Sequence, residues 1–505
     1  RAFAGNEAIG KLILPESVIE IQQEAFADCV VLQTLNFPKG LRKIGISAFE
    51  GCVKLLRAEI PAGVITLSNS VFSRCRKLGQ VVWEEKSKLK EIGQQVFYGC
   101  SKLKDLIFPE TLERIGALAF YQCDTLRCII LPKAVKQMDA EAFACCKGLQ
   151  EVIIEGKLSK WGRNLFAYAE KLKKVTFSEE QQILPEYFAW KCTELQQVIV
   201  SDALKMVGLA ALEGTAFLKK FAEPKIWGTI FLDGKEQKNK VVIPDGVTAI
   251  AGGAFYGNSQ ITSLVLPETI EWIGERAFCS CTELKEVRLP KKVSVISSGA
   301  FAYCTKLKQV FADGTIKEVG EKAFYQCFSL ESVPDFSQTK IGDYAFSGCR
   351  EWKNGTIKKA QIGAYALEET GLLKAQFEKK WQTEKERVIY TTSVIIGDTI
   401  VDGSRAKGDV IFSTISSEIR AIAPYAYYGN CQITRIVLPE GLKEIGDFAF
   451  CGCTRLCEVV IPDSVERIGN SAFEKCCQLL TFSSAATEVG KRAFSCNESL
   501  RFVSL

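Results

Sequence analysis

The chain has 505 residues, of which 47% are apolar and 24% charged, a composition typical of folded proteins and not of disordered ones. Its net charge of +5 is spread without a block of like charges, which is too dilute to indicate a nucleic acid or an anionic membrane as partner. No apolar run is long enough to predict a membrane-spanning helix. Histidine is absent, which removes the commonest general base and metal ligand.

An Ala-Phe pair recurs along the chain, and most intervals between successive pairs are 23 residues. The series begins at Phe3 and continues through Phe26, Phe49 and Phe72. When replacements of the aromatic by Leu or Tyr are included, there are 20 repeats. A fixed period of this length predicts a solenoid in which each repeat forms one turn.

One complete unit, Cys453–Lys475, reads CTRLCEVVIPDSVERIGNSAFEK. The apolar alternation from Leu456 to Ile461 predicts a short β-strand, which Pro462 ends because proline cannot donate to a ladder. A second apolar pair leads to Gly469, and the following Ala-Phe pair is expected to pack as a short helical turn under the strand. One unit is too small to bury its apolar face, so the units are expected to stack with parallel strands.

The order Cys-x-x-Leu-x-x-Val-x-Ile-Pro-x-x-Val-x-x-Ile-Gly-x-x-Ala-Phe resembles the BspA-like, or Treponema-type, leucine-rich repeat. The resemblance covers nearly the whole chain and implies an α/β leucine-rich-repeat solenoid, a horseshoe or right-handed superhelix rich in β-strand with short helical turns. It also implies a surface protein of bacteria or protists, often an adhesin toward host proteins, other cells or matrix. No ligand-specific residue carries over, because family members differ on the exposed strand face.

Twelve of the 21 cysteines follow the repeat aromatic by three positions, so stacking places them in one row about 5 Å apart. We expect a structural ladder inside the solenoid, because Cys is commonly buried and is a weak donor. Its members are Cys29, Cys52, Cys75, Cys100, Cys123, Cys146, Cys281, Cys304, Cys327, Cys349, Cys453 and Cys476. Where an array restarts, the same position holds Asn6, Asn258 or Asn430, whose amide can satisfy turn backbone groups by itself.

Disulfides and metal are the alternatives for the cysteines. Side chains of one row point in parallel and not toward each other, which disfavours disulfides. The CxC pairs Cys279/Cys281 and Cys451/Cys453 lack the histidine or CxxC partners of a zinc site. We therefore predict no metal and no cofactor. The many thiols suggest a reducing or anaerobic setting.

Two long gaps interrupt the repeat, and each contains a strand that runs into Asp-Gly, a short polar loop and a second strand: Trp227–Pro244 and Ile396–Ser413. This pattern predicts a β-hairpin whose second strand continues into the next repeat. The hairpins are expected to act as internal caps, with ligand binding as the alternative role. They divide the chain into three arrays, residues 1–222, 223–378 and 379–505. The chain starts at an entry repeat and ends without a polar cap, so we expect truncation at both ends.

Residues between the inward-facing positions of each strand are expected to face solvent on the concave side. One such row in the first array is almost wholly apolar and is called here the apolar stripe: Val82, Ile107, Ile130, Ile153, Thr176 and Ile199. The neighbouring row is mainly polar and includes Arg57, Asp105, Glu151 and Lys174. An apolar stripe beside polar residues is typical of an interaction surface. The alternative is that β-branched residues here only stabilise the sheet.

No nucleophile, phosphate-binding or nucleotide-binding motif is present, so we predict no enzymatic activity. The leading interpretation is a non-catalytic protein-binding scaffold, an adhesin-like protein at the cell surface or secreted, that recognises host or cell-surface macromolecules. No nucleic acid, small-molecule substrate or membrane insertion is expected. The alternatives are a cytoplasmic scaffold for protein partners, which the thiol content would suit, and a structural spacer that presents another domain.

Overall fold

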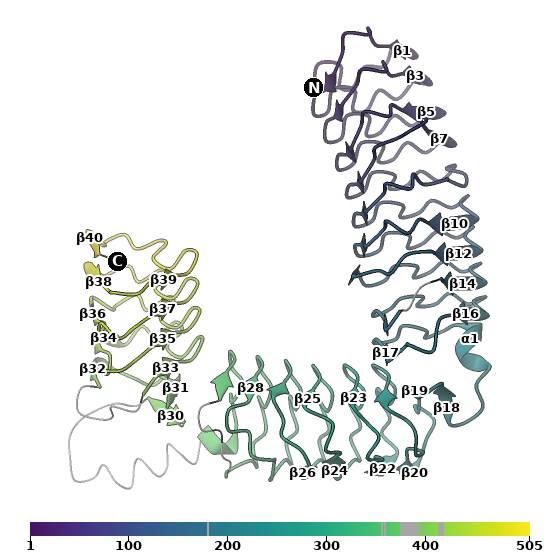
Figure 1. Cartoon of the computed structure of the whole chain (residues 1–505). Coiled ribbons are helices and arrows are strands. Elements are labelled where there is room, and N and C mark those ends of the chain that lie inside the picture. The colour runs from purple at the N-terminus through teal and green to yellow at the C-terminus, as the bar shows by residue number, and fades with distance from the viewer. Residues whose placement is uncertain are drawn as a thin grey trace, which may run out of the picture. The chain divides into compact units, whose positions relative to one another are not determined.

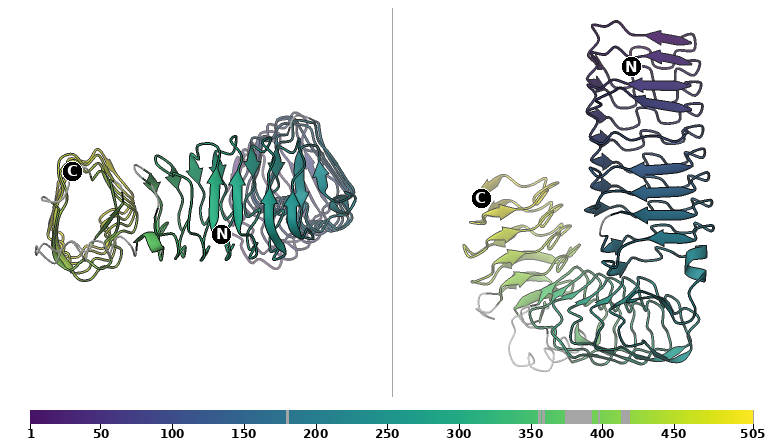
Figure 2. Two further views of the ribbon diagram at one scale, coloured as in Figure 1. Left: turned by 90° about the horizontal axis from the view of Figure 1, so that it is seen from below. Right: turned by 45° about the vertical axis from the view of Figure 1, so that its right-hand side comes forward.

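The computed structural model describes residues 1–178, 181–354, 357, 360–373, 393–396, 398–412 and 419–504. Gly397 and Ser413 of the second predicted hairpin lie outside these ranges, as does the predicted array boundary between residues 378 and 379. The chain forms two compact units: Arg1–Asp233 with Ala249–Ala254, and Gly234–Thr248 with Phe255–Leu505. Within each unit the chain winds through a stack of similar turns, and strands of successive turns lie side by side (Figures 1 and 2). The division into three arrays stays a prediction.

The first row of strands comes from the Leu-x-x-Val-x-Ile segments, and its strands pair in parallel, which confirms the predicted solenoid. In the first unit the row contains β1 (Lys11–Ile13), β3 (Thr34–Asn36), β5 (Arg57–Ile60), β7 (Gln80–Trp83), β10 (Cys128–Leu131), β12 (Glu151–Ile154), β14 (Lys174–Phe177) and β16 (Gln197–Ile199). In the second unit it contains β20 (Asn239–Val242), β22 (Ile261–Val265), β24 (Glu286–Leu289), β26 (Gln309–Ala312), β32 (Gly408–Ile411), β34 (Ile433–Val437), β36 (Glu458–Val460), β38 (Thr481–Ser483) and β40 (Phe502–Ser504).

A second row of two-residue strands, absent from the sequence prediction, precedes the Ile-Gly glycines. In the first unit it contains β2 (Glu20–Ile21), β4 (Lys43–Ile44), β6 (Thr66–Leu67), β8 (Glu91–Ile92), β9 (Arg114–Ile115), β11 (Gln137–Met138), β13 (Lys160–Trp161), β15 (Ile183–Leu184), β17 (Met206–Val207) and β21 (Ala249–Ile250). In the second unit it contains β23 (Trp272–Ile273), β25 (Val295–Ile296), β27 (Glu318–Val319), β28 (Lys340–Ile341), β29 (Gln361–Ile362), β33 (Ala421–Ile422), β35 (Glu444–Ile445), β37 (Arg467–Ile468) and β39 (Glu488–Val489). The glycine that follows allows the turns to approach closely: a Cβ on Gly469 would lie 2.5 Å from the backbone nitrogen of Asp447.

The Ala-Phe segments form hydrogen-bonded turns where short helical turns were expected. In the repeat of Phe49, left-handed residues Ser47 (φ 53°) and Gly51 (φ 72°) flank the aromatic. Ala48 N donates within its own turn to Gly45 O, whereas Phe49 N donates to Val71 O of the next turn. Every second N–H group donates to a carbonyl of the next turn, and residues with left-handed backbone recur. The continuous hydrogen bonding of an α-helix therefore cannot form. Little of the described chain is helical, and the helix α1 (Ala216–Lys219) has four residues.

Aromatic rings form the centre of the core. Phe120, which is fully buried, stacks between Phe97 and Phe143 with ring centroids 5.2 and 4.8 Å apart. The same stacking continues through the second unit, for example from Phe278 to Phe301 at 5.3 Å. Stacked rings at each rung add aromatic pair energy to the burial of apolar area.

The hairpin prediction was wrong about which strands form each hairpin. The antiparallel pairs lie one strand earlier: β18 (Lys225–Trp227) with β19 (Ile230–Asp233), and β30 (Val394–Ile396) with β31 (Thr399–Asp402). Gly228, at φ 58°, supplies the tight turn between β18 and β19. The strands after Asp-Gly, β20 and β32, instead pair in parallel with β22 and β34, so their continuation into the next repeat is confirmed.

Asparagine at the entry position bonds the loop that precedes its repeat. Asn258 Nδ2 donates to Gly234 O (2.9 Å) and Gln237 O (2.8 Å), while its Oδ1 accepts from Gln260 N (2.9 Å). Asn430 makes the equivalent bonds around Gly403. The expectation that this amide satisfies turn backbone groups is confirmed.

Candidate interaction surface

The apolar stripe lies on the first row of strands in the first unit. Three of its side chains are exposed: 89% of Ile107, 46% of Ile130 and 47% of Ile199 are accessible to solvent. Ile153 and Thr176 are half-buried and occupy successive rungs beside Ile130 in register. These residues therefore form one continuous row of side chains along the stack.

Two stripe residues depart from a uniform apolar row. Val82 is half-buried on β7, which pairs with β5. Thr176 Oγ1 is buried and has no hydrogen-bond partner among the described residues. The continuous exposed apolar surface thus centres on Ile107 and Ile130, which are joined by a parallel bridge.

The predicted polar residues beside the stripe hold one another or the backbone. Glu151 and Lys174 form an ion pair of 3.0 Å between Oε1 and Nζ. Asp105 Oδ1 accepts from the backbone nitrogens of Arg127 (2.7 Å) and Cys128 (3.1 Å). Pairs of this kind define the edge of the stripe and add little stability at an exposed surface.

Arg57 lies in a separate hollow of about 490 Å³ on β3 and β5. Its guanidinium bonds Glu59 and Gln80 at 3.3 Å each. Asn36 and Phe37 also line the hollow. The sequence pattern did not reveal this hollow, because its depth depends on how side chains of adjacent turns pack.

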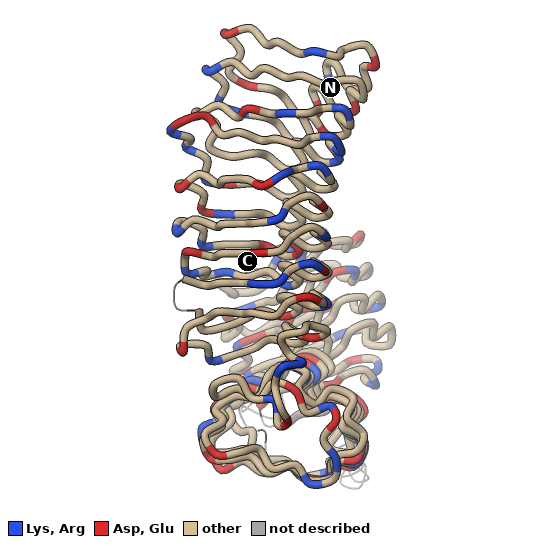
Figure 3. Tube along the Cα trace, turned by 90° about the vertical axis from the view of Figure 1, so that its right-hand side faces the viewer, with Lys and Arg blue, Asp and Glu red and all other residues tan. Residues whose placement is uncertain are grey.

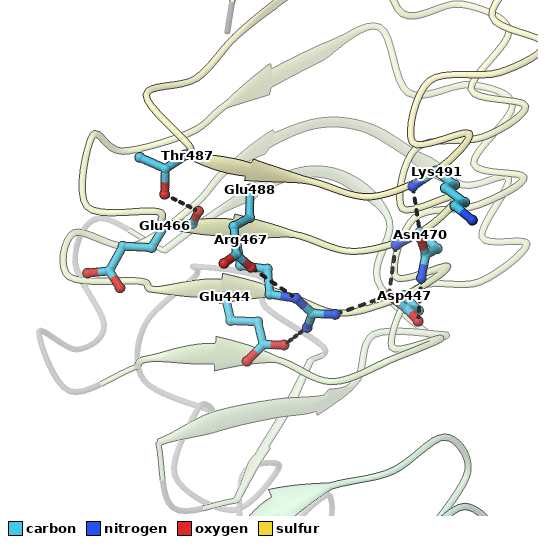
Figure 4. Close-up of polar contacts among 8 residues, drawn as sticks. All are labelled: Glu444, Asp447, Glu466, Arg467, Asn470, Thr487, Glu488 and Lys491. Carbon is cyan, nitrogen blue, oxygen red and sulfur yellow. Dashed lines mark hydrogen bonds and ion pairs between the residues drawn. The ribbon is translucent and has the colours of Figure 1, made fainter.

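Most charged residues of the second row of strands pair with a residue of opposite charge. Arg467 on β37 pairs with Glu444 on β35 and lies 3.9 Å from Glu488 on β39, and Asn470 N donates to Asp447 Oδ1 at 2.7 Å (Figure 4). In the first unit Arg114 likewise joins Glu91 and Asp139. Along the turns of the chain, lysine and arginine are interspersed with aspartate and glutamate (Figure 3). A face whose charges are mutually neutralised offers less to a partner than the stripe does.

Each of the twelve cysteines of the predicted ladder is fully buried, and its Sγ donates to the carbonyl of the repeat aromatic one turn earlier, at 3.1 to 3.3 Å. Cys192 makes the same contact with Phe166 O at 3.0 Å. It was missed because it follows its aromatic by four positions. Burial raises the pKa of Cys52, Cys192 and Cys476 to about 12. All 21 cysteines are free thiols.

Over the described ranges, no three His, Cys, Asp or Glu residues gather as a candidate metal site. The helices of that same part of the chain are all too short or too polar to cross a membrane.

The repeat geometry defines a leucine-rich-repeat solenoid. A family model described as BspA type leucine rich repeat region (6 copies) matches residues 1–127, 115–233, 224–353, 315–396 and 413–505. The chain belongs to this family. No curated protein matches the chain.

Several solved structures are similar to the chain. A leucine-rich repeat protein from Bacteroides ovatus is 21% identical, with a TM-score of 0.36 over 98% of this chain and 94% of that one. A leucine rich cell surface protein from Faecalibacterium prausnitzii is 20% identical, with a TM-score of 0.35 over 64% of this chain and 87% of that one. The pneumococcal vaccine antigen PcpA is 19% identical, with a TM-score of 0.27 over 70% and 74%.

Proposed function

We propose that the chain is a non-catalytic scaffold that binds a protein partner through the apolar stripe, and that it does so as an adhesin-like protein at the cell surface. The observation that carries the proposal is the apolar stripe on the first row of strands, in which Ile107, Ile130 and Ile199 are exposed. Leucine-rich-repeat solenoids generally bind proteins and are typically non-catalytic. The surface location rests on the BspA-type family and is tested separately.

Three features support binding by the stripe over a purely structural role. Ile107 exposes 89% of its surface, so it gains little from packing in the isolated chain. Beside the stripe Glu151 is paired with Lys174, and Asp105 accepts two backbone hydrogen bonds. A partner that covers the stripe therefore meets charged groups that already have partners. Apolar centres within polar rims are the usual anatomy of protein interfaces.

Ile130→Glu tests the stripe, with Ile46→Glu as the matched control. Both isoleucines expose 46% of their surface, but Ile46 lies in a turn away from the stripe. Neither change should alter the free energy of unfolding by more than about 0.5 kcal/mol. Binding is measured on an array of immobilised cell-surface and matrix proteins, and Ile130→Glu should weaken it at least about tenfold. Equal binding by both variants would refute the stripe as the contact surface.

The surface location is tested by antibody labelling of intact cells that express the native gene. Labelling without permeabilisation supports an exposed adhesin-like protein. Labelling that appears only after permeabilisation would favour a cytoplasmic scaffold.

A further inference from the structure

A groove in the second unit is lined by tyrosines and carboxylates. It is separate from the apolar stripe. It has a volume of about 220 Å³ and lies beside β29 and β33. We call it the tyrosine groove and define it by six of its lining residues: Tyr365, Glu368, Glu369, Asp402, Tyr425 and Tyr428. The groove is smaller than the roughly 300 Å³ from which small-molecule sites begin, so its size suits one side chain better than a whole cofactor.

The tyrosines belong to a row that crosses the second interruption of the repeat. Tyr365 and Tyr425 each stand two residues before the repeat position that Phe usually occupies, held here by Leu367 and Tyr427. Their ring centroids lie 5.0 Å apart. Tyr344 and Phe448 extend the row at 5.1 and 4.9 Å. Tyr428, half of whose surface is exposed, packs against Tyr425 at 5.3 Å. Aromatic side chains are thus concentrated at the second interruption of the repeat.

The groove is negative although the chain as a whole carries a charge of +5. Its described lining residues include three carboxylates and no lysine or arginine. Glu369 is paired with Arg350, so the negative charge comes from Glu368 and Asp402. Glu368 accepts from Ser347 Oγ, and Asp402 Oδ1 accepts from Ser404 N, which leaves further lone pairs on both carboxylates. Burial raises the pKa of Tyr365 to about 12, so its hydroxyl is neutral near pH 7 and the carboxylates set the charge.

Cations are already held by the same combination of groups in the neighbouring turns. Lys322 Nζ lies 5.4 Å from the centroid of the Tyr344 ring and 2.7 Å from Glu321 Oε1. Arg350 Cζ lies 5.2 Å from the Phe328 ring centroid, and its Nη2 lies 3.0 Å from Glu369 Oε2. An aromatic ring with an adjacent carboxylate is a favourable site for an ammonium or guanidinium group.

We propose that the tyrosine groove binds the cationic side chain, arginine or lysine, of a partner polypeptide. Asp402 and Glu368 supply the negative charge, and Tyr425 and Tyr428 supply the ring surface. The partner is a segment with positive charge, because charge complementarity is the property that distinguishes this groove from the neutralised strand face described above. The inference does not depend on the apolar stripe, which lies in the other unit.

The test uses the full chain and two peptides, acetyl-Gly-Gly-Arg-Gly-Gly-amide and the same peptide with citrulline in place of arginine. Citrulline has nearly the same shape but no charge. Ligand-observed NMR titration at low ionic strength gives both dissociation constants. The arginine peptide should bind at least about tenfold more tightly, and added salt should weaken its binding.

Asp402→Asn should weaken binding of the arginine peptide about fivefold, because it removes one carboxylate without changing the side-chain volume. Tyr425→Leu should weaken it by a similar factor through loss of the ring. Glu440→Gln is the matched control, since Glu440 is an exposed carboxylate in the same unit and outside the groove. Circular dichroism checks the fold of each variant.

Equal affinity for the two peptides, no binding of the arginine peptide, or an Asp402→Asn variant that binds like the wild type would each overturn the proposal. Ile130→Glu should leave peptide binding unchanged. The experiments therefore distinguish failure of the groove proposal from failure of the stripe proposal.

Discussion

Replacing Cys123 with alanine tests whether the buried thiols contribute to stability. Cys123 is fully buried, and its Sγ donates to Phe97 O at 3.2 Å. The carbonyl keeps a second bond, from Cys100 N at 3.1 Å, so losing the thiol should cost about 0.5 to 1 kcal/mol at this hydrogen bond. Removing the sulfur from a packed site costs about 1 kcal/mol more in lost burial and cavity formation. The free energy of unfolding should fall by about 1.5 to 2 kcal/mol.

Urea unfolding followed by far-ultraviolet circular dichroism in the presence of reductant measures this change. Cys496→Ala is the control, because Cys496 is exposed and should change the free energy of unfolding by less than about 0.5 kcal/mol. The comparison requires that both variants unfold with the same dependence of the free energy on urea concentration. If Cys123→Ala is then no more destabilising than the control, the buried thiols do not contribute to stability and the reasoning is refuted.

Two further predictions concern pH and packing. Burial raises the pKa of Cys52 to about 12 from an ordinary 9.0, so its contribution to stability is complete below pH 9 and is lost as the pH rises toward 12. The free energy of unfolding, measured by urea titration at stepped pH, should fall over that window; an unchanged value would contradict the burial of the ladder. Gly469→Ala should lower the melting temperature, at a cost of about 1 to 3 kcal/mol, because the new Cβ would lie 2.5 Å from Asp447 N. Gly10→Ala, where the nearest atom is 4.0 Å away, is the control, and equal melting temperatures for the two variants would show that the turns can separate at no cost.

The sequence alone determined the repeat and its register. A nearly constant spacing brings equivalent residues to the same position on successive turns, so Glu151 faces Lys174 and Phe120 stacks on Phe143. Proline after the strand and cysteine after the aromatic occupy fixed places for the same reason. The backbone geometry and the core positions of one turn repeat in the next, and for this reason one copy such as Cys453–Lys475 describes most of the fold.

Local sequence signals did not predict the secondary structure correctly where the backbone hydrogen bonds are made to a neighbouring turn. The second row of strands has only two residues per strand, too few for an alternating pattern, and Arg467–Ile468 is a strand only because adjacent turns pair with it. The Ala-Phe segments are turns because alternate N–H groups donate to the next turn. The Asp-Gly signal at Asp233 suggested a hairpin, but the chain makes its reversal earlier, at Gly228.

Tertiary structure also decided which surfaces are available. The repeat places Ile107 and Ile153 in equivalent positions, yet Ile107 is 89% exposed whereas Ile153 is half-buried, because exposure depends on the side chains of adjacent turns. The tyrosine groove depends still more on the fold. Tyr365 and Tyr425 are separated by an interruption that breaks the repeat numbering, and only the stacking of the turn at β29 with the turn at β33 brings their rings within 5.0 Å.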